Sequence, residues 1–289
     1  MTMISEIRNP ERVYQPSVAI TSSGSDQDAR INAFMDKYGI DAQYESAIRN
    51  LADYEIVVIA DDSGSMLGRM GTQSHTKWVE LKRLLITVAK IATIFDSNGF
   101  DLVFLNRASQ KSVQNSDLID TYFRDEPDGG TPLLRRLDEV MSSYRRKLEE
   151  RKLLVFVATD GEPSDGNMVN WFETKFTSDP LLRERVAVSF VMCTEEERVL
   201  KVYNETIDEI KGKGSNQDLN IDVSDAYPIQ RARVLSNNPS INYSEGTHLA
   251  KVLTGSFTRS FDLLDQKRVA AKNGVVIVDQ VPKACCTVS

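Results

Sequence analysis

The chain has few of the residues that build most transition-metal and redox sites. Among its 289 residues are three cysteines, Cys193, Cys285 and Cys286, and two histidines, His75 and His248. Their spacing fits neither a zinc site nor a disulfide framework. We therefore expect no histidine-based metal site and no enzyme that depends on a histidine base. The cysteine content is typical of a protein made in a reducing cytosol.

The sequence also lacks long apolar segments. Its first 20 residues, MTMISEIRNPERVYQPSVAI, contain early charges and no uninterrupted apolar stretch, which is not the pattern of a signal peptide. No apolar run approaches the roughly 20 residues that a transmembrane helix needs. We therefore expect a cytoplasmic protein, with any membrane attachment made at the cytosolic face.

Positive charge is not in excess. The chain has 42 acidic and 35 basic residues, which gives a net charge of −7. A nucleic-acid binder needs a cationic face to neutralise phosphates, so nucleic acid is not an expected partner. The first predicted strand is not followed by a Gly-x-Gly-x-x-Gly or Walker loop, and no Gly-x-Ser-x-Gly elbow occurs. The usual phosphate cradle and serine-hydrolase nucleophile are therefore not expected.

From about residue 54 onward, apolar runs alternate with helical patterns. The runs at 54–60, 100–106, 153–158 and 185–193 are rich in β-branched and aromatic residues and predict strands buried on both faces. Segments between them repeat apolar residues every three or four positions, as amphipathic helices do. This order predicts a Rossmann-like three-layer α/β/α sandwich with a mostly parallel central sheet.

The composition divides the chain into three parts. Residues 1–50 are polar and predict a flexible N-terminal arm with no more than short helical turns. Residues 51–265 predict one folded domain, and residues 266–289 a C-terminal tail. We find no internal repeat and no second domain.

Oxygen-bearing side chains follow two of the predicted strands. DDSGS, which contains Asp61, Ser63 and Ser65, comes after the first strand, and Asp160 comes after the strand at 153–158. Thr131 follows Asp-Gly-Gly at a predicted helix start and supplies a third loop. If the two strands are neighbours at a topological switch point, these loops converge. Two carboxylates and three hydroxyls suit Mg²⁺ or Mn²⁺, and they leave a coordination position for an outside carboxylate.

Each of these residues also has a simpler interpretation. Thr131 before Pro132 is a favourable helix N-cap, and the two serines and the Thr-Asp-Gly sequence are common in turns. Asp62 is out of phase with its neighbours and is expected to face solvent or the backbone. Glu162 and Asp165 are expected to form a solvated rim.

Taken together, the motifs resemble those of the von Willebrand factor A domain. DDSGS at 61–65, GGTP at 129–132 and TDGEPSD at 159–165 are similar to the D-x-S-x-S, threonine and aspartate of its metal-ion-dependent adhesion site. The resemblance covers residues 54–265 and implies a sheet with one antiparallel edge strand. Two further segments, LNIDVSDAYPIQRARV and GTHLAKVLTG, are similar to uncharacterised intracellular eukaryotic members. The implied metal ligands are Asp61, Ser63, Ser65, Thr131 and Asp160.

This resemblance implies a non-enzymatic interaction module in which a partner's Asp or Glu completes the metal shell. One alternative is a Mg²⁺-dependent phosphoester hydrolase with Asp61 or Asp62 as nucleophile. Against it, Ser63 occupies the position of the general acid, and the motifs contain no lysine. The other alternative is a scaffold protein with a purely structural metal.

The last four residues, Cys-Thr-Val-Ser, fit a prenylation box. The terminal serine favours farnesyl at Cys286, and Cys285 is a candidate for a second, palmitoyl chain. A single lipid gives only marginal membrane binding, so a second signal is needed. The simpler interpretation is a chance cysteine pair in a frayed tail.

Overall fold

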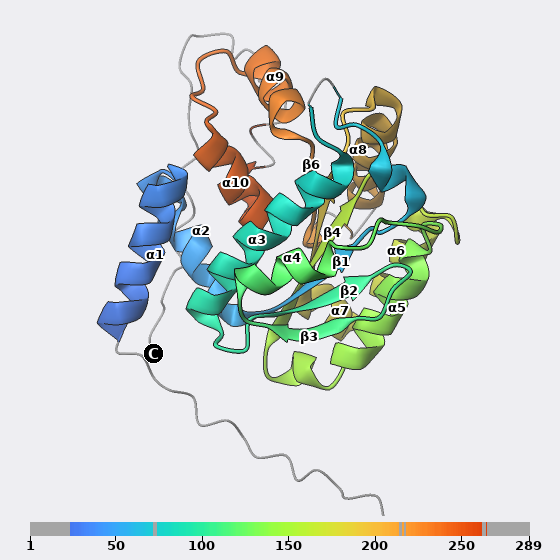
Figure 1. Cartoon of the computed structure of the whole chain (residues 1–289), viewed down its shortest axis with the longest axis horizontal. Helices are drawn as coiled ribbons and strands as arrows, with labels where there is room; N and C mark the ends of the chain where they lie inside the picture. The colour runs from blue at the N-terminus through green and yellow to red at the C-terminus, as the bar shows by residue number, and fades with distance from the viewer. Residues whose placement is uncertain (1–23, 72–73, 214–215, 217, 262–263, 265–289) are drawn as a thin grey trace, which may run out of the picture.

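A six-stranded sheet in the order β3-β2-β1-β4-β5-β6 forms the centre of the protein (Figure 1). The computed structural model describes residues 24–71, 74–213, 216, 218–261 and 264. Among the strands of these described residues, only β3 is antiparallel to its neighbour, and it lies at the edge. The fold predicted from the alternating pattern is therefore confirmed. The strands are β1 (Tyr54–Ala60), β2 (Phe100–Phe104), β3 (Gln110–Val113), β4 (Lys152–Thr159), β5 (Val186–Met192) and β6 (Ile221–Ser224).

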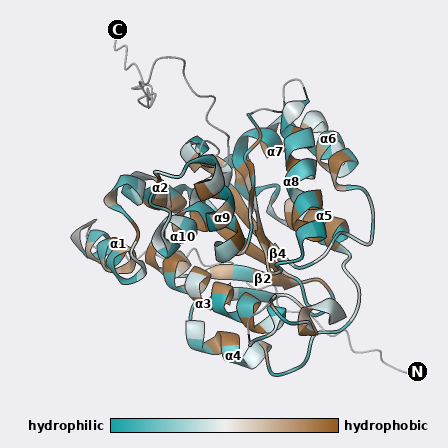
Figure 2. Ribbon diagram, turned by 90° about the horizontal axis from the view of Figure 1, so that it is seen from above, coloured by the Kyte–Doolittle hydropathy of each residue, from teal (hydrophilic) through white to brown (hydrophobic). Residues whose placement is uncertain are grey.

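Helices cover both faces of this sheet, and apolar residues concentrate between the layers (Figure 2). On one face lie α1 (Gly24–Tyr38), α2 (Glu45–Arg49), α3 (Lys77–Phe95), α4 (Ile119–Tyr122) and α10 (Glu245–Thr254). On the other lie α5 (Leu133–Tyr144), α6 (Met168–Ser178), α7 (Pro180–Arg185) and α8 (Glu197–Gly212). Helix α9 (Tyr227–Asn237) precedes α10. No helix within the described part of the chain is long and apolar enough to cross a membrane.

The β-branched composition of the strands follows from their burial on two sides. In β1, Ile56 and Val58 join the core under α3, whereas Val57 and Ile59 join the core under α5. Successive side chains of a strand point to opposite faces, so a strand between two helical layers needs apolar residues at every position.

The start of the described chain differs from its prediction. Residues 24–50 were expected to belong to a flexible arm, but α1 and α2 pack onto the domain, with Ile31, Phe34 and Met35 buried. Arg30 of α1 donates a hydrogen bond of 2.8 Å to the carbonyl of Thr93 at the end of α3. The buried side chains recur at helical spacing within a segment that is polar on average. The composition of the segment therefore did not indicate the amphipathic helix. Residues 1–23 lie outside the described part.

The packing of α1 gives a stability prediction. Phe34 is 5 % exposed and packs against Tyr38 in a tilted arrangement, with ring centroids 4.6 Å apart. Phe34→Ala should lower the free energy of unfolding by about 3 kcal/mol, because it leaves a cavity in a packed core. Chemical unfolding followed by circular dichroism measures this. Asn32→Ala, on the exposed side of the same helix, is the matched control and should change little. Equal stabilities would mean that α1 does not dock.

Candidate metal centre

The carboxyl ends of β1 and β4 lie side by side in the sheet. Ala60 pairs with Ala158, and the amide of Asp61 continues the ladder by donating to the carbonyl of Ala158 at 2.9 Å. The chain passes from β1 to β2 on one side, while β4 lies on the other, so the strand order reverses here. Ligands of open α/β sheets bind at such a switch point. The adjacency on which the sequence prediction depended is confirmed.

Four of the five predicted ligand residues form one chain of hydrogen bonds at this position. The amide of Ser63 donates to Asp61 Oδ1 at 2.9 Å. The hydroxyls of Ser63 and Ser65 are 3.0 Å apart, and Ser65 Oγ donates to Asp160 Oδ1 at 2.8 Å. Asp61 is 1 % exposed and Asp160 3 %. Two buried carboxylates from separate strands thus converge on a pair of serine hydroxyls.

Asp61 is held in place from both sides. Its Oδ2 accepts a 2.6 Å hydrogen bond from the hydroxyl of Thr159, the last residue of β4. Burial raises the pKa of Asp61, although hydrogen bonds from Ser63 and Thr159 oppose this effect. Each carboxylate oxygen has two lone pairs, so these bonds leave acceptor capacity for a cation.

The third loop is joined to the other two through its backbone. The amide of Gly64 donates to the carbonyl of Gly129 at 3.2 Å, and the amide of Ser164 donates to the carbonyl of Thr131 at 2.9 Å. The half-buried Thr131 therefore lies between the Asp61 loop and the Asp160 loop. Within the described residues, its hydroxyl forms no hydrogen bond to the other four predicted ligands.

The capping interpretation of Thr131 is wrong. The N-cap residue of α5 is Pro132, which makes no side-chain cap. Instead Asp165, from the Asp160 loop, accepts hydrogen bonds from the amides of Leu134 at 3.1 Å and Arg135 at 2.8 Å. Asp165 was expected only as part of a solvated rim, yet it caps α5 from another loop. The threonine hydroxyl is thus not committed to the helix end.

Asp62 supports the site without belonging to the ligand set. It is fully buried, and its Oδ1 accepts from the amide of Asn106 at 2.8 Å, while Arg107 Nε lies 3.3 Å from Oδ2. Asn106 in turn donates from Nδ2 to the carbonyl of Gly130 at 2.9 Å. The prediction that Asp62 faces the backbone is therefore correct, and the alternative that it faces solvent is wrong. Burial raises the pKa of Asp62, and hydrogen bonds from Asn106 oppose the shift.

Lys77 is the residue at the site that the motifs did not reveal. Its Nζ donates to Asp160 Oδ2 at 2.9 Å and to Glu196 Oε1 at 2.6 Å. Burial alone would lower the pKa of Lys77, but the hydrogen bonds to Glu196 and Asp160 outweigh it and raise the pKa. One feature of the sequence could have drawn attention to Lys77. It is the first residue of α3, and a helix N-terminus disfavours a positive charge, so a lysine at this position needs an acidic partner nearby.

The donor set fits a hard cation with an incomplete shell. Mg²⁺ and Mn²⁺ prefer oxygen ligands, and every candidate side chain offers oxygen. In the part of the chain that the structure describes, no three or more His, Cys, Asp or Glu side chains gather into a metal-holding cluster. The candidate set has only two carboxylates, so it depends on hydroxyls, water and outside ligands.

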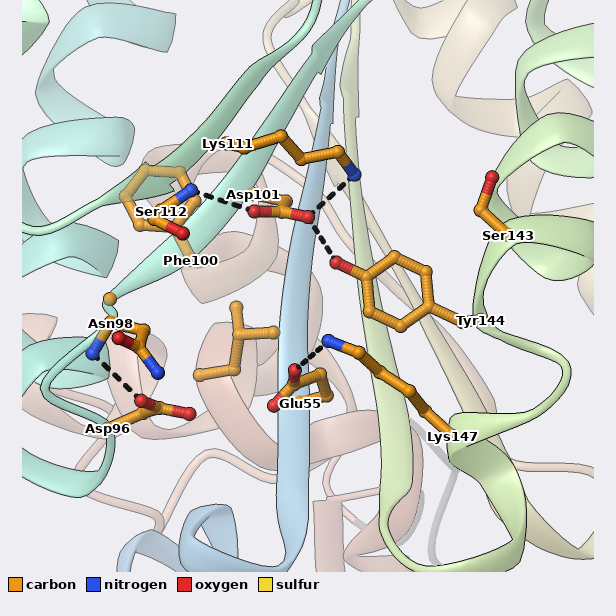
Figure 3. Close-up of a pocket in the computed structure, with 12 residues that line it drawn as sticks. Glu55, Asp96, Asn98, Phe100, Asp101, Lys111, Ser112, Ser143, Tyr144 and Lys147 are labelled. Carbon is orange, nitrogen blue, oxygen red and sulfur yellow. Dashed lines mark hydrogen bonds and ion pairs between the residues drawn. The ribbon is translucent and has the colours of Figure 1, made fainter. Parts of the chain in front are cut away.

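A hollow of about 310 Å³ lies at the opposite, amino-terminal ends of β1 and β2 (Figure 3). Lys111 Nζ is 2.6 Å from Asp101 Oδ2, and Lys147 Nζ is 2.6 Å from Glu55 Oε1. Burial alone would raise the pKa of Asp101, but hydrogen bonds from Lys111 and Tyr144 outweigh it and lower the pKa. Because these charges neutralise one another, the hollow indicates no particular ligand.

Comparison with known protein families finds no family that matches the chain, and comparison with curated proteins finds no matching relative. The likeness to the von Willebrand factor A domain therefore rests on the motifs. Cys285 and Cys286, the predicted lipidation residues, lie outside the described residues.

The network around Asp62 gives a second stability prediction. Asp62→Ala should lower the free energy of unfolding by about 1–2 kcal/mol, because it removes the acceptor that anchors Asn106 and leaves Arg107 without its ion pair. Urea unfolding measures the loss. Asp125→Ala is the control, because it removes an exposed carboxylate that follows α4. A loss no greater than that of the control would mean that Asp62 does not hold the loop.

Proposed function

We propose that the chain is a von Willebrand factor A-like interaction module that binds Mg²⁺ or Mn²⁺ at the carboxyl edge of its sheet. Asp61, Ser63, Ser65, Thr131 and Asp160 would hold the ion, which supplies a positive centre for an acidic ligand. A partner protein would bind by presenting an Asp or Glu carboxylate to the ion.

The observation that carries this proposal is the 2.8 Å hydrogen bond between Ser65 and Asp160, residues 95 positions apart. It brings the serine pair of the first motif against the aspartate of the third. The backbone bonds of Gly129 and Thr131 add the second motif to the same place. Turn-forming residues with only local roles would not need to meet across three loops.

The metal proposal is tested on the exposed serine. Ser65→Ala removes one hydroxyl ligand and should weaken Mg²⁺ and Mn²⁺ binding at least about tenfold. It should lower the free energy of unfolding by only about 1 kcal/mol, because the exposed Ser65 loses one hydrogen bond to Asp160 while Lys77 still pairs with that carboxylate. Isothermal titration calorimetry measures the affinity. Ser164→Ala, an exposed serine in the Asp160 loop, should bind like the wild type. If Ser65→Ala and the wild type bind equally, Ser65 is not a ligand.

Partner binding is tested by its dependence on the ion. Proteins co-precipitated with the wild-type chain in Mg²⁺ should be lost in excess EDTA and lost with Ser65→Ala, because both remove the cation that receives the partner carboxylate. Mass spectrometry of the paired samples identifies them. Partners retained in EDTA would rule out a metal-bridged contact.

Lys77 bears on the phosphoester hydrolase alternative. It places a cation 2.9 Å from Asp160, which removes the objection that a lysine is missing. The other objection remains, because Ser63 occupies the general-acid position and its hydroxyl lies 3.0 Å from that of Ser65. We therefore favour the interaction module over the hydrolase.

Lipid attachment remains part of the proposal. A farnesyl group at Cys286, with a second chain at Cys285, would place the module at the cytosolic face of a membrane. This would hold the metal site close to membrane-bound partners.

A further inference from the structure

The candidate metal centre already contains a positive charge that belongs to the chain itself. Lys77 has a side chain only 6 % exposed, and it lies against Asp160, whose side chain is 1 % exposed. Its second partner, Glu196, is 61 % exposed at the rim of the site. The ammonium group is therefore buried on the side of the proposed ligands, and on its other side it pairs with an exposed carboxylate at the surface.

The position of Lys77 is unfavourable for a positive charge unless that charge is paired with carboxylates. Burying an ammonium group without partners is costly, and the first residue of a helix is the end where cations are disfavoured. Its backbone amide donates to the carbonyl of Gly68 at 2.9 Å, which fixes the start of α3 beside the loop that carries Ser65. The helix thus holds the ammonium group at the edge of the oxygen set.

Asp160 divides its two oxygens between the serine and the lysine. Oδ1 accepts from Ser65, whereas Oδ2 accepts from Lys77. A divalent ion among the predicted ligands would therefore share one carboxylate with an ammonium group of like charge. Two cations on one buried carboxylate repel each other strongly, because a protein interior screens charge less than water does.

We propose that Lys77 is a tethered cation that competes with the divalent ion for Asp160, and that Glu196 is the acceptor that holds Lys77 when the ion binds. Without the ion, Lys77 neutralises Asp160 and keeps the site folded. With the ion, its bond to Glu196 retains the ammonium group at the rim. Lys77 therefore sets the ion concentration at which the module becomes competent for a partner. This inference rests on the proposed metal site, but not on the partner's identity.

The first test removes the tethered charge. Lys77→Met keeps the apolar stem and should bind Mg²⁺ and Mn²⁺ at least about tenfold more tightly than the wild type, because the competing charge is gone. Its midpoint of thermal unfolding without metal should fall, since the buried Asp160 keeps its hydrogen bond from Ser65 but loses its counter-charge, and saturating metal should restore it. The control is Lys82→Met. Lys82 also lies on α3 but forms a surface ion pair with Asp120 of α4, so its variant should change neither the metal affinity nor the effect of metal on thermal unfolding.

The second test removes the alternative acceptor and needs no change in the buried pair. Glu196→Gln should weaken metal binding at least about threefold more than Glu162→Gln, because only the former leaves Lys77 with Asp160 as its sole carboxylate. Glu162 is exposed in the Asp160 loop, where it pairs with Arg198 at 2.8 Å, so its variant loses the same charge near the site without touching Lys77.

The outcomes separate this inference from the metal proposal. If the wild type binds metal, Ser65→Ala weakens it, and Lys77→Met binds no more tightly, the inference is wrong and the metal site stands. A variant that loses stability without gaining affinity would show that Lys77 has only a structural role. If neither the wild type nor Lys77→Met responds to metal in calorimetry or thermal unfolding, both proposals fail. Tight binding by Lys77→Met that disappears in Lys77→Met/Ser65→Ala supports both.

Discussion

Two carboxylates buried side by side are the constraint around which the carboxyl edge of the sheet is built. Asp61 and Asp160 extend from adjacent parallel strands, each almost inaccessible to water. Like charges in such a place destabilise the fold unless hydrogen bonds and a counter-charge oppose them. Thr159 and the amide of Ser63 stabilise the first carboxylate, while Ser65 and Lys77 stabilise the second.

Backbone hydrogen bonds join the three loops around these two carboxylates. Gly129 and Thr131 accept backbone hydrogen bonds from the first and third loops, so the three motifs form one rim. Behind the rim, Asp62 anchors Asn106, and Asp165 caps α5. Neither aspartate is a proposed ligand. Both fix the backbone from which the proposed ligands project, and such supporting contacts decide how well a site is preorganised.

The regular part of the fold was predictable because burial on two faces leaves a strong trace in the sequence. The run at 54–60 became β1 with unchanged bounds, and α3 follows the apolar spacing closely. The docked N-terminal helices were missed because Ile31, Phe34 and Met35 are scattered among polar residues. A short stripe of this kind signals a helix only when a complementary surface is known to exist, and that surface comes from α3 and α10.

The sequence by itself determined the layered fold and four of the side chains that meet at the site, because strand ends on the same edge of a parallel sheet are close in space. Only the tertiary structure decided what accompanies them. Lys77 reaches Asp160 from a helix start 83 residues away, and Asp165 caps a helix that begins earlier in the chain. Such contacts depend on how loops lie against one another, which no local pattern of residues encodes.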